Sequence, residues 1–199
     1  MISPIIIING PTGVGKTAVI KKLFHRIPQL RSTITYSTRP PRHNAREDKK
    51  MIYVSPSQFK SHIDKGDILE WARYDGHLYG TAKKSVALAN GDPLLFNIEI
   101  KGTRRIKKLY PNCLTIFIRP DSMSQIKQRL QKRGLEPHEF RRRYHEAQNA
   151  MKNAHFYDFQ VTNHQDKIGQ TVSQIEHIIQ TYLKGRQLEP IIDKKTKKR

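Results

Sequence analysis

The sequence lacks the features that mark secreted and membrane-spanning proteins. It has a single cysteine, Cys113, so no disulfide framework can form within the chain, and a reducing compartment is expected. No apolar run approaches the roughly 20 residues that a membrane-spanning helix needs. The apolar start of the chain is too short for a secretory signal and has no charged residues before it. We therefore expect a cytoplasmic protein without a membrane span, in which Cys113 is a small buried side chain.

Acidic residues are also scarce. The chain has 17 Asp and Glu against 37 Lys and Arg, which gives a formal net charge of +20 over 199 residues. Residues 184–199 carry seven basic and two acidic side chains, so +15 remains on the rest. Such a charge favours phosphorylated ligands and other polyanions. The 36% of hydrophobic residues is typical of a globular protein. We expect one domain over 1–185, followed at 186–199 by a mobile basic tail that could bind polyanions nonspecifically.

Short apolar runs alternate with helical patterns along the chain. This alternation predicts an α/β fold with a largely parallel sheet. Trp71 lies in one of the predicted strands and is expected to pack in the core. The predicted strands are 4–9, 67–74, 93–98, 113–118 and 159–162, and the predicted helices are 16–25, 56–65, 103–109, 121–133, 136–153 and 168–183.

A glycine-rich segment after the first predicted strand carries the clearest chemistry. It matches the pattern G-x-x-x-x-G-K-[ST] between a strand and a helix. Its glycines let backbone N–H groups surround phosphate oxygens, and the following helix adds its positive N-terminal end. Lys16 is expected to neutralise the β- and γ-phosphates, and the Thr17 hydroxyl to coordinate Mg²⁺ as the cofactor. The predicted ATP-binding residues of this loop are Gly10, Pro11, Thr12, Gly13, Val14, Gly15, Lys16 and Thr17.

Eight segments of the chain form a pattern in a fixed order. They are Gly10–Thr17, Ser37–Arg42, Val54–Phe59, Leu69–Ala72, Gly76–Thr81, Ile98–Gly102, Arg129–Gly134 and Val161–Asn163. In this order, the chain resembles the guanylate kinase family over nearly all of Ile5–Ile179. The resemblance implies a P-loop NTPase-type parallel sheet core with a small GMP-binding insertion at about 34–82 and a helical lid at about 125–148. It also implies the reaction, in which the γ-phosphoryl group of ATP moves to GMP, and to dGMP. The sequence leaves a monomer and a homodimer open.

The resemblance also assigns residues to the acceptor. Arg39 and Arg42 align with arginines that hold the GMP phosphate by paired charged hydrogen bonds. Glu70 and Glu99 align with carboxylates that accept from the guanine N1–H and 2-amino group. Adenine has neither donor on that edge, so it would leave both carboxylates desolvated and unpaired. The implied GMP-binding residues are Thr35, Arg39, Arg42, Glu70, Tyr79, Thr81 and Glu99.

The predicted lid, Gln125–Gln148, carries seven Lys and Arg with few acids. By resemblance it closes over ATP and brings arginines to the transferring phosphoryl group, where positive charge stabilises the transition state. No general base is needed, because the GMP phosphate is already an anionic nucleophile. Asn163 aligns with an asparagine that contacts adenine, which adds it to the ATP-binding set. The implied catalytic residues are Lys16, Arg39, Arg129, Arg133 and Arg143.

The chain departs from the family pattern at four places. Met51 stands where a tyrosine usually donates to the GMP phosphate, and the loop at 43–50 is more basic than usual. Asn97 replaces an acidic residue, and an amide assists Mg²⁺ less than a carboxylate does. Lys101 replaces a glutamine beside Glu99. These changes leave open a weaker GMP affinity or a different acceptor.

Three other functions stay open. A kinase of the same fold could act on another phosphorylated acceptor, although the guanine-reading residues argue against it. A guanylate-kinase-like module that binds phosphopeptides, with weak or no catalysis, typically loses the P-loop lysine and the lid arginines, which this chain keeps. Nucleic-acid binding could be the main role, although no RNA-binding motif with interleaved aromatics is visible.

Overall fold

The computed structural model describes residues 3–41 and 50–185. Arg42, the rest of the loop up to residue 49, and the predicted tail at 186–199 lie outside the described residues. The chain divides into two compact units. Unit 1 joins the N-terminal residues up to Ile5 to Gln29–Cys113, and unit 2 joins Ile6–Pro28 to the chain after Cys113.

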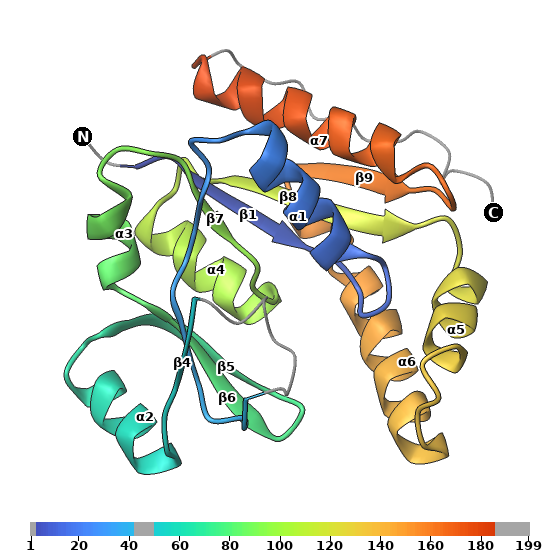
Figure 1. Ribbon diagram of the computed structural model, residues 1–199, viewed down its shortest axis with the longest axis horizontal. Coiled ribbons are helices and arrows are strands. Elements are labelled where there is room, and N and C mark those ends of the chain that lie inside the picture. The colour runs from blue at the N-terminus through green and yellow to red at the C-terminus, as the bar shows by residue number, and fades with distance from the viewer. Residues whose placement is uncertain (1–2, 42–49, 186–199) are drawn as a thin grey trace. The chain divides into compact units, whose positions relative to one another are not determined.

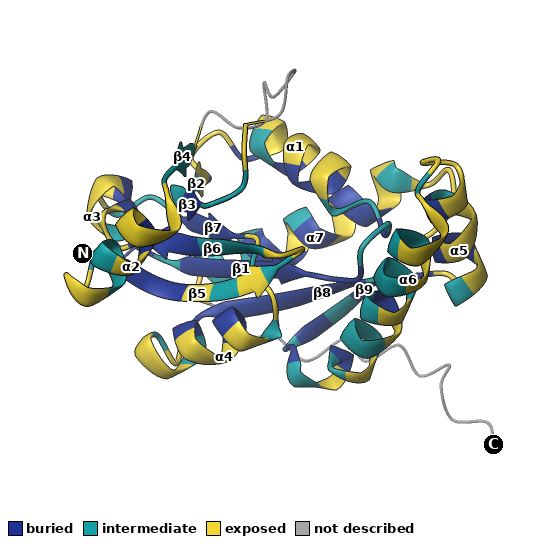
Figure 2. Ribbon diagram, turned by 90° about the horizontal axis from the view of Figure 1, so that it is seen from below, coloured by how far each residue is buried: buried dark blue, intermediate teal, exposed yellow. Residues whose placement is uncertain are grey.

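Unit 2 is built on three parallel strands, which are β1 (Ile5–Asn9), β8 (Leu114–Pro120) and β9 (Phe159–Asn163). In the ladders, β8 lies between the other two, with Ile6 paired with Leu114 and Ile116 with Phe159. Every residue of β1 is buried, as are all but one of β8 (Figure 2). Strands covered on both faces read as continuous apolar runs, which is why the sequence pattern locates them.

Five helical segments complete unit 2. They are α1 (Lys16–Arg26), α5 (Met123–Gln131), α6 (Pro137–Lys152), the 3₁₀ turn η2 (Ala154–Phe156) and α7 (Ile168–Leu183). Helices α1 and α7 lie side by side (Figure 1), joined at the surface by an ion pair between Arg26 and Glu176. Helix α5 begins after Ser122, which caps it: the Ser122 hydroxyl accepts a hydrogen bond from the backbone N–H of Gln125.

Unit 1 contains a four-stranded sheet in the order β4 (Met51–Tyr53), β3 (Thr35–Ser37), β6 (His77–Ala82) and β5 (Ile68–Tyr74). Strands β3 and β4 run parallel, and the other pairs are antiparallel. The β5–β6 hairpin turns through Asp75 and Gly76, whose φ values of 52° and 76° suit a tight hairpin turn. Helix α2 (Pro56–Asp64) packs on this sheet through the fully buried Phe59.

Among the described residues of unit 1 there are also a two-stranded parallel ladder and two further helices. Strand β2 (Arg31–Ser32) pairs with β7 (Leu94–Phe96). The helices are α3 (Lys84–Ala89) and α4 (Ile100–Leu109). Glu99 stands at the N-cap of α4, directly after the segment that follows β7. The α/β class predicted from the sequence, with a parallel sheet core, is confirmed.

Two predictions about single residues have opposite outcomes. Cys113 is buried, as predicted. The prediction of core packing for Trp71 is wrong, because 42% of this residue is exposed. Alternation explains the difference: within β5, Glu70 faces inward, so its neighbour Trp71 points the other way. Among residues 3–41 and 50–185, no helix is long and apolar enough to cross a membrane.

Candidate active site

The glycine-rich segment forms a loop between β1 and α1 in unit 2. Gly10 follows the last residue of β1, and the helix begins at Lys16. A Cβ at Gly10 would lie 2.4 Å from the backbone oxygen of Ile118 in β8, so the loop can run this close to the sheet only with glycine. Gly13 and Gly15 take left-handed φ values of 80° and 100°, which turn the backbone into the helix.

The two polar side chains at the start of α1 are placed at the mouth of this loop. The Lys16 ammonium group donates to the backbone oxygens of Gly10 at 2.5 Å and Pro11 at 3.1 Å. Thr17 lies exposed in the first turn, where backbone N–H groups have no acceptor within the helix. Together with the positive end of the helix, these groups make an anion-binding site.

Two side chains from distant segments hold the loop at Val14. The Arg129 guanidinium from α5 donates to the backbone oxygens of Val14 at 2.9 Å and Gly13 at 3.3 Å. The Asn163 amide, buried at the end of β9, donates to the same oxygen of Val14 at 2.8 Å. Thr171 in turn donates to the Asn163 side-chain oxygen at 2.9 Å. Asn163 therefore joins the phosphate loop to Thr171, and no sequence pattern indicates the part that Thr171 plays.

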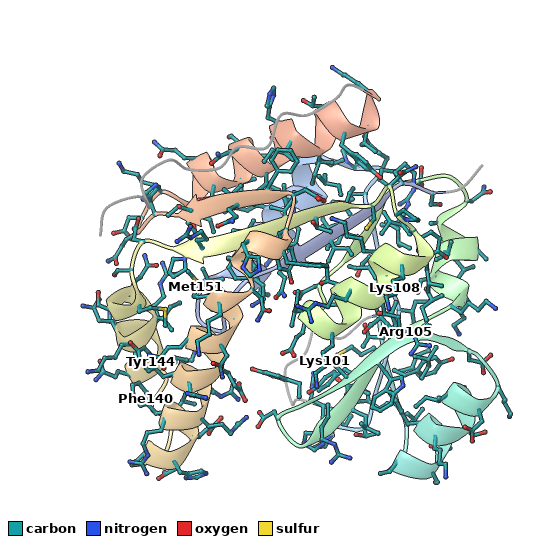
Figure 3. The ribbon with its side chains drawn as sticks, turned by 180° about the vertical axis from the view of Figure 1, so that it is seen from behind. Lys101, Arg105, Lys108, Phe140, Tyr144 and Met151 are labelled. Atoms are coloured by element: carbon teal, nitrogen blue, oxygen red, sulfur yellow. The ribbon has the colours of Figure 1, made fainter. Side chains whose placement is uncertain are left out.

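The other predicted lid arginines are not at the loop. Arg143 donates to Glu139 one turn earlier on α6, at 2.8 Å. Arg133 is exposed in the turn after α5. On the same helix α6, the rings of Phe140 and Tyr144 stack nearly parallel, with centroids 6.1 Å apart (Figure 3). Of the three arginines, the structure brings only Arg129 to the phosphate loop.

In unit 1, the predicted guanine-reading residues meet on neighbouring strands. Glu70 on β5 is only 4% exposed, and its Oε1 accepts a hydrogen bond of 2.6 Å from the Thr81 hydroxyl on β6. Thr35 on β3 is paired in register with Thr81. Glu99 is exposed at the N-cap of α4. A buried carboxylate with one oxygen already anchored can present a fixed acceptor to a ligand.

The electrostatics of Glu70 are set by several neighbours. Burial raises the pKa of the Glu70 carboxyl above its ordinary value, because the charged form loses water. Hydrogen bonds from Thr81 and the positive charge of Arg105, on α4 (Figure 3), lower this pKa, while the charge of Glu99 raises it. The net shift is upward. A perturbed carboxyl at a buried position is a common mark of a functional site.

Of the residues predicted to bind the GMP phosphate, Arg39 and Tyr79 are described by the structure, whereas Arg42 lies outside the described residues. Arg39 follows β3 and donates to the backbone oxygen of Pro40 at 2.8 Å, and its guanidinium lies 5.4 Å from the centre of the Tyr53 ring. Its other terminal nitrogen lies 3.5 Å from the Met51 sulfur. Tyr79 on β6 meets Tyr74 edge-on, with ring centroids 6.3 Å apart. The departure at Met51 thus lies against Arg39, which the sequence alone did not indicate.

The residues present suit a magnesium ion that is held mainly by a nucleotide. Among the described residues, no group of three or more His, Cys, Asp and Glu is placed to hold a metal. Mg²⁺ commonly keeps several waters and binds substrate phosphates with few protein ligands. The exposed Thr17 hydroxyl at the phosphate loop fits this pattern.

Comparisons with known proteins agree with this geometry. The guanylate kinase family model matches residues 2–182. The chain is 36% identical over 180 residues to a guanylate kinase of Prochlorococcus marinus subsp. pastoris, covering 89% of this chain and 97% of that protein. It is 33% identical over 181 residues to a guanylate kinase of Gloeobacter violaceus, covering 89% and 87%.

A solved structure shows the same fold. The crystal structure of guanylate kinase from Anaplasma phagocytophilum matches with a TM-score of 0.72 at 22% identity, covering 90% of this chain and 86% of that one. The match of the family model over most of the chain, and relatives above 30% identity along nearly their whole length, settle the relationship. The chain belongs to the guanylate kinase family.

Proposed function

We propose that this chain transfers the γ-phosphoryl group of ATP to GMP, and to dGMP, giving ADP and the corresponding diphosphate. The observation that carries the proposal is the buried Glu70 carboxylate, anchored by Thr81 at 2.6 Å. Burying a carboxylate is costly unless a partner uses it, and a guanine base offers two donors on one edge. GMP and dGMP share the base and the phosphate, which are the groups that the proposed contacts reach.

On the donor side, the loop from Gly10 to Thr17 binds the ATP phosphates. Its backbone N–H groups and the Lys16 ammonium group offset the phosphate charge. The Thr17 hydroxyl would hold Mg²⁺, and the ion would supply additional neutralisation of the phosphate charge. Asn163 keeps its predicted contact with adenine as part of this proposal, alongside its hydrogen bond to Val14.

On the acceptor side, Glu70, Glu99, Thr35 and Thr81 read guanine. Arg39, Arg42 and Tyr79 hold the GMP phosphate and orient one of its oxygens for in-line attack. The chain needs no general base, because this oxygen already carries negative charge. Arg129, Arg133 and Arg143 stabilise the charge on the transferring group when the lid at 125–148 closes.

The experiment is a coupled assay of ADP release with ATP and Mg²⁺. The acceptors are GMP, dGMP, AMP, CMP, UMP and ribose phosphates, and Lys16→Ala is the inactive control. Turnover restricted to GMP and dGMP, and lost in the control, is the expected result. Turnover on a different acceptor would show that Met51, Asn97 and the loop at 43–50 have changed the substrate. Binding of ATP without any turnover would instead favour a binding module.

The setting of the enzyme is also a proposal. We infer a cytoplasmic location, supported by the single buried cysteine. Cell fractionation tests it, and light scattering of the purified full chain separates a monomer from a homodimer. Binding of polyanions by the basic tail stays a prediction, tested by a gel shift of the full chain and of a chain ending at residue 185, at two salt concentrations.

A further inference from the structure

The first turn of α4 comes unusually close to the Glu70 carboxylate. Gly102 is the third residue of this helix and is buried. A Cβ built on Gly102 would lie 2.4 Å from Oε2 of Glu70 and 3.0 Å from its carboxyl carbon. Contacts shorter than 3.0 Å are essentially never made by real Cβ atoms. Only a residue without a side chain therefore leaves the carboxylate where it is.

Two residues of unit 1 constrain the position of the Glu70 carboxylate, one at each of its oxygens. Its Oε1 accepts from the Thr81 hydroxyl on β6, while Oε2 faces the α-carbon of Gly102. The Thr81 bond fixes one oxygen, and the helix backbone limits where the other can go. The direction in which Glu70 can accept from a ligand is thus set by α4 as well as by the sheet.

Gly102 is not required by the backbone conformation. It lies within α4 and is not among the glycines with positive φ. Glycine is the poorest helix former after proline, so alanine would be preferred at such a position if space allowed. Gly169 in α7 gives the contrast: it is also a helical glycine without positive φ, but a Cβ there would meet nothing within 4 Å.

We propose that Gly102 is a specificity-determining positioning residue, which makes room for the Glu70 carboxylate and so sets its alignment with the guanine edge. The inference rests on the proposed function. A methyl group at position 102 would push the carboxylate out of its place, and its alignment with the guanine edge, which it is proposed to read together with Glu99, would be lost. The atom to be displaced is the end of a side chain, so recognition should suffer more than folding.

The test compares Gly102→Ala with Gly169→Ala in steady-state kinetics and thermal unfolding. For Gly102→Ala, kcat/KM for GMP should fall at least about tenfold, since a shift of about 1 Å at a reacting site can cost more than that. Its KM for ATP should stay within about twofold, because the phosphate loop belongs to unit 2. The preference for GMP over IMP, which lacks the 2-amino group, should also fall. Gly169→Ala should leave all these values unchanged.

A second variant separates positioning from a general structural role. In Glu70→Asp the carboxylate is one methylene shorter and no longer reaches the α-carbon of residue 102. Adding Gly102→Ala to Glu70→Asp should therefore cost less activity on GMP than adding it to the wild type.

Three results would overturn the inference. One is wild-type kinetics on GMP in Gly102→Ala. Another is an equal loss for ATP and GMP together with a lower unfolding temperature. The third is the same penalty in the Glu70→Asp background. A wild-type protein that does not phosphorylate GMP would contradict the proposed function itself, whereas an active wild type with an unaffected Gly102→Ala would contradict only this inference.

Discussion

The phosphate loop of unit 2 and the Glu70 region of unit 1, the two proposed nucleotide sites, are built in different ways. The loop is contiguous in sequence and uses mainly backbone groups, with its shape held by Arg129 and Asn163 at Val14. The Glu70 region depends on one buried carboxylate, located by Thr81 from β6 and Gly102 from α4. A site built from backbone groups can be encoded by a short sequence motif. A site built from side chains depends on how separate elements pack.

The two regions should therefore fail in different ways when they are altered. Damage to the loop should affect every phosphoryl acceptor equally, because ATP is common to all of them. Damage to the Glu70 region should change which acceptor is used and leave ATP binding intact.

The largest effect is expected from Lys16→Ala. The ammonium group stabilises the negative charge on the transferring phosphoryl group. Without it, turnover with GMP should fall by about 10³-fold or more. The coupled ADP-release assay measures it. Lys22→Ala, at an exposed position of the same helix, is the control and should be as active as the wild type. A Lys16→Ala variant that kept a tenth of its activity would contradict the proposed role of the loop.

The next effect is expected from Glu70→Gln. Loss of the anionic acceptor should reduce kcat/KM for GMP by about 10²-fold, with little change in KM for ATP. Folding should not weaken at neutral pH, because burial disfavours the charge that the substitution removes. Steady-state kinetics and thermal unfolding test both statements. Asp92→Asn, at a partly exposed position that lies outside the proposed site, is the control. An equal decrease in kcat/KM for ATP would show that the two regions do not act separately.

Asn163→Ala should have an intermediate effect, and this effect should fall on the phosphate loop. It removes the hydrogen bond to Val14 and the shorter of the two that the Thr171 hydroxyl donates, at a cost of about 1–3 kcal/mol in the free energy of unfolding. A looser loop should raise KM for ATP by about tenfold and leave KM for GMP unchanged. Denaturant unfolding and kinetics measure the two changes. A variant with an unaltered KM for ATP would remove Asn163 from the donor site.

The pH dependence of stability and of GMP binding should report on Glu70, and so on the region of unit 1. Since burial raises its pKa above the ordinary 4.5, the folded protein holds this proton more tightly than the unfolded chain does. Its contribution to stability is therefore greatest at low pH and is lost as pH rises through the raised pKa. The pH dependence of GMP binding should have the opposite sign, because the ionised form of the carboxyl is the better acceptor for a guanine donor.

The matching measurement is KM for GMP between about pH 8 and about pH 5. It should rise several-fold as pH falls in the wild type and stay flatter in Glu70→Gln. Arg105 and Glu99 shift this pKa in opposite directions, so Arg105→Gln should move the wild-type profile to higher pH. Parallel profiles in the wild type and in Glu70→Gln would contradict the assignment.

The smallest effect is expected from Met51→Tyr. The Met51 sulfur lies 3.5 Å from Arg39, where a tyrosine hydroxyl could donate to the same phosphate that Arg39 is proposed to hold. One added hydrogen bond is expected to lower KM for GMP by about threefold. KM for ATP is the internal control. A higher KM for GMP would indicate that Met51 and Arg39 are already arranged for this chain's acceptor.

Most regular elements could be predicted from the sequence where a repeated pattern was long enough. The buried strands β1, β8 and β9 and helices α1 and α7 begin and end within about three residues of their predicted bounds. Strands β2, β3, β4 and β6 and helix α3 were not predicted. Two of these strands have three residues, too few for an alternation to show, and β6 carries the half-buried and polar side chains of the site.

The site could be predicted only to the extent that it is a local motif. The loop from Gly10 to Thr17 lies where the pattern puts it. The hydrogen bond of Asn163 to Val14 joins residues 149 positions apart, and no periodicity encodes it. The approach of Gly102 to Glu70 likewise depends on how α4 packs against β5. Trp71 was misplaced because its neighbour Glu70, a carboxylate, occupies the inward side of β5.

The most direct test of two separate recognition sites is calorimetric titration of ATP with Mg²⁺, and separately of GMP, into the wild type, Lys16→Ala and Glu70→Gln. A crossed pattern is expected. Lys16→Ala should bind ATP more weakly and GMP within about twofold of the wild type, and Glu70→Gln should do the reverse. Equal weakening of the binding of both nucleotides in either variant, or a wild type that does not bind GMP, would contradict the proposal of two separate sites.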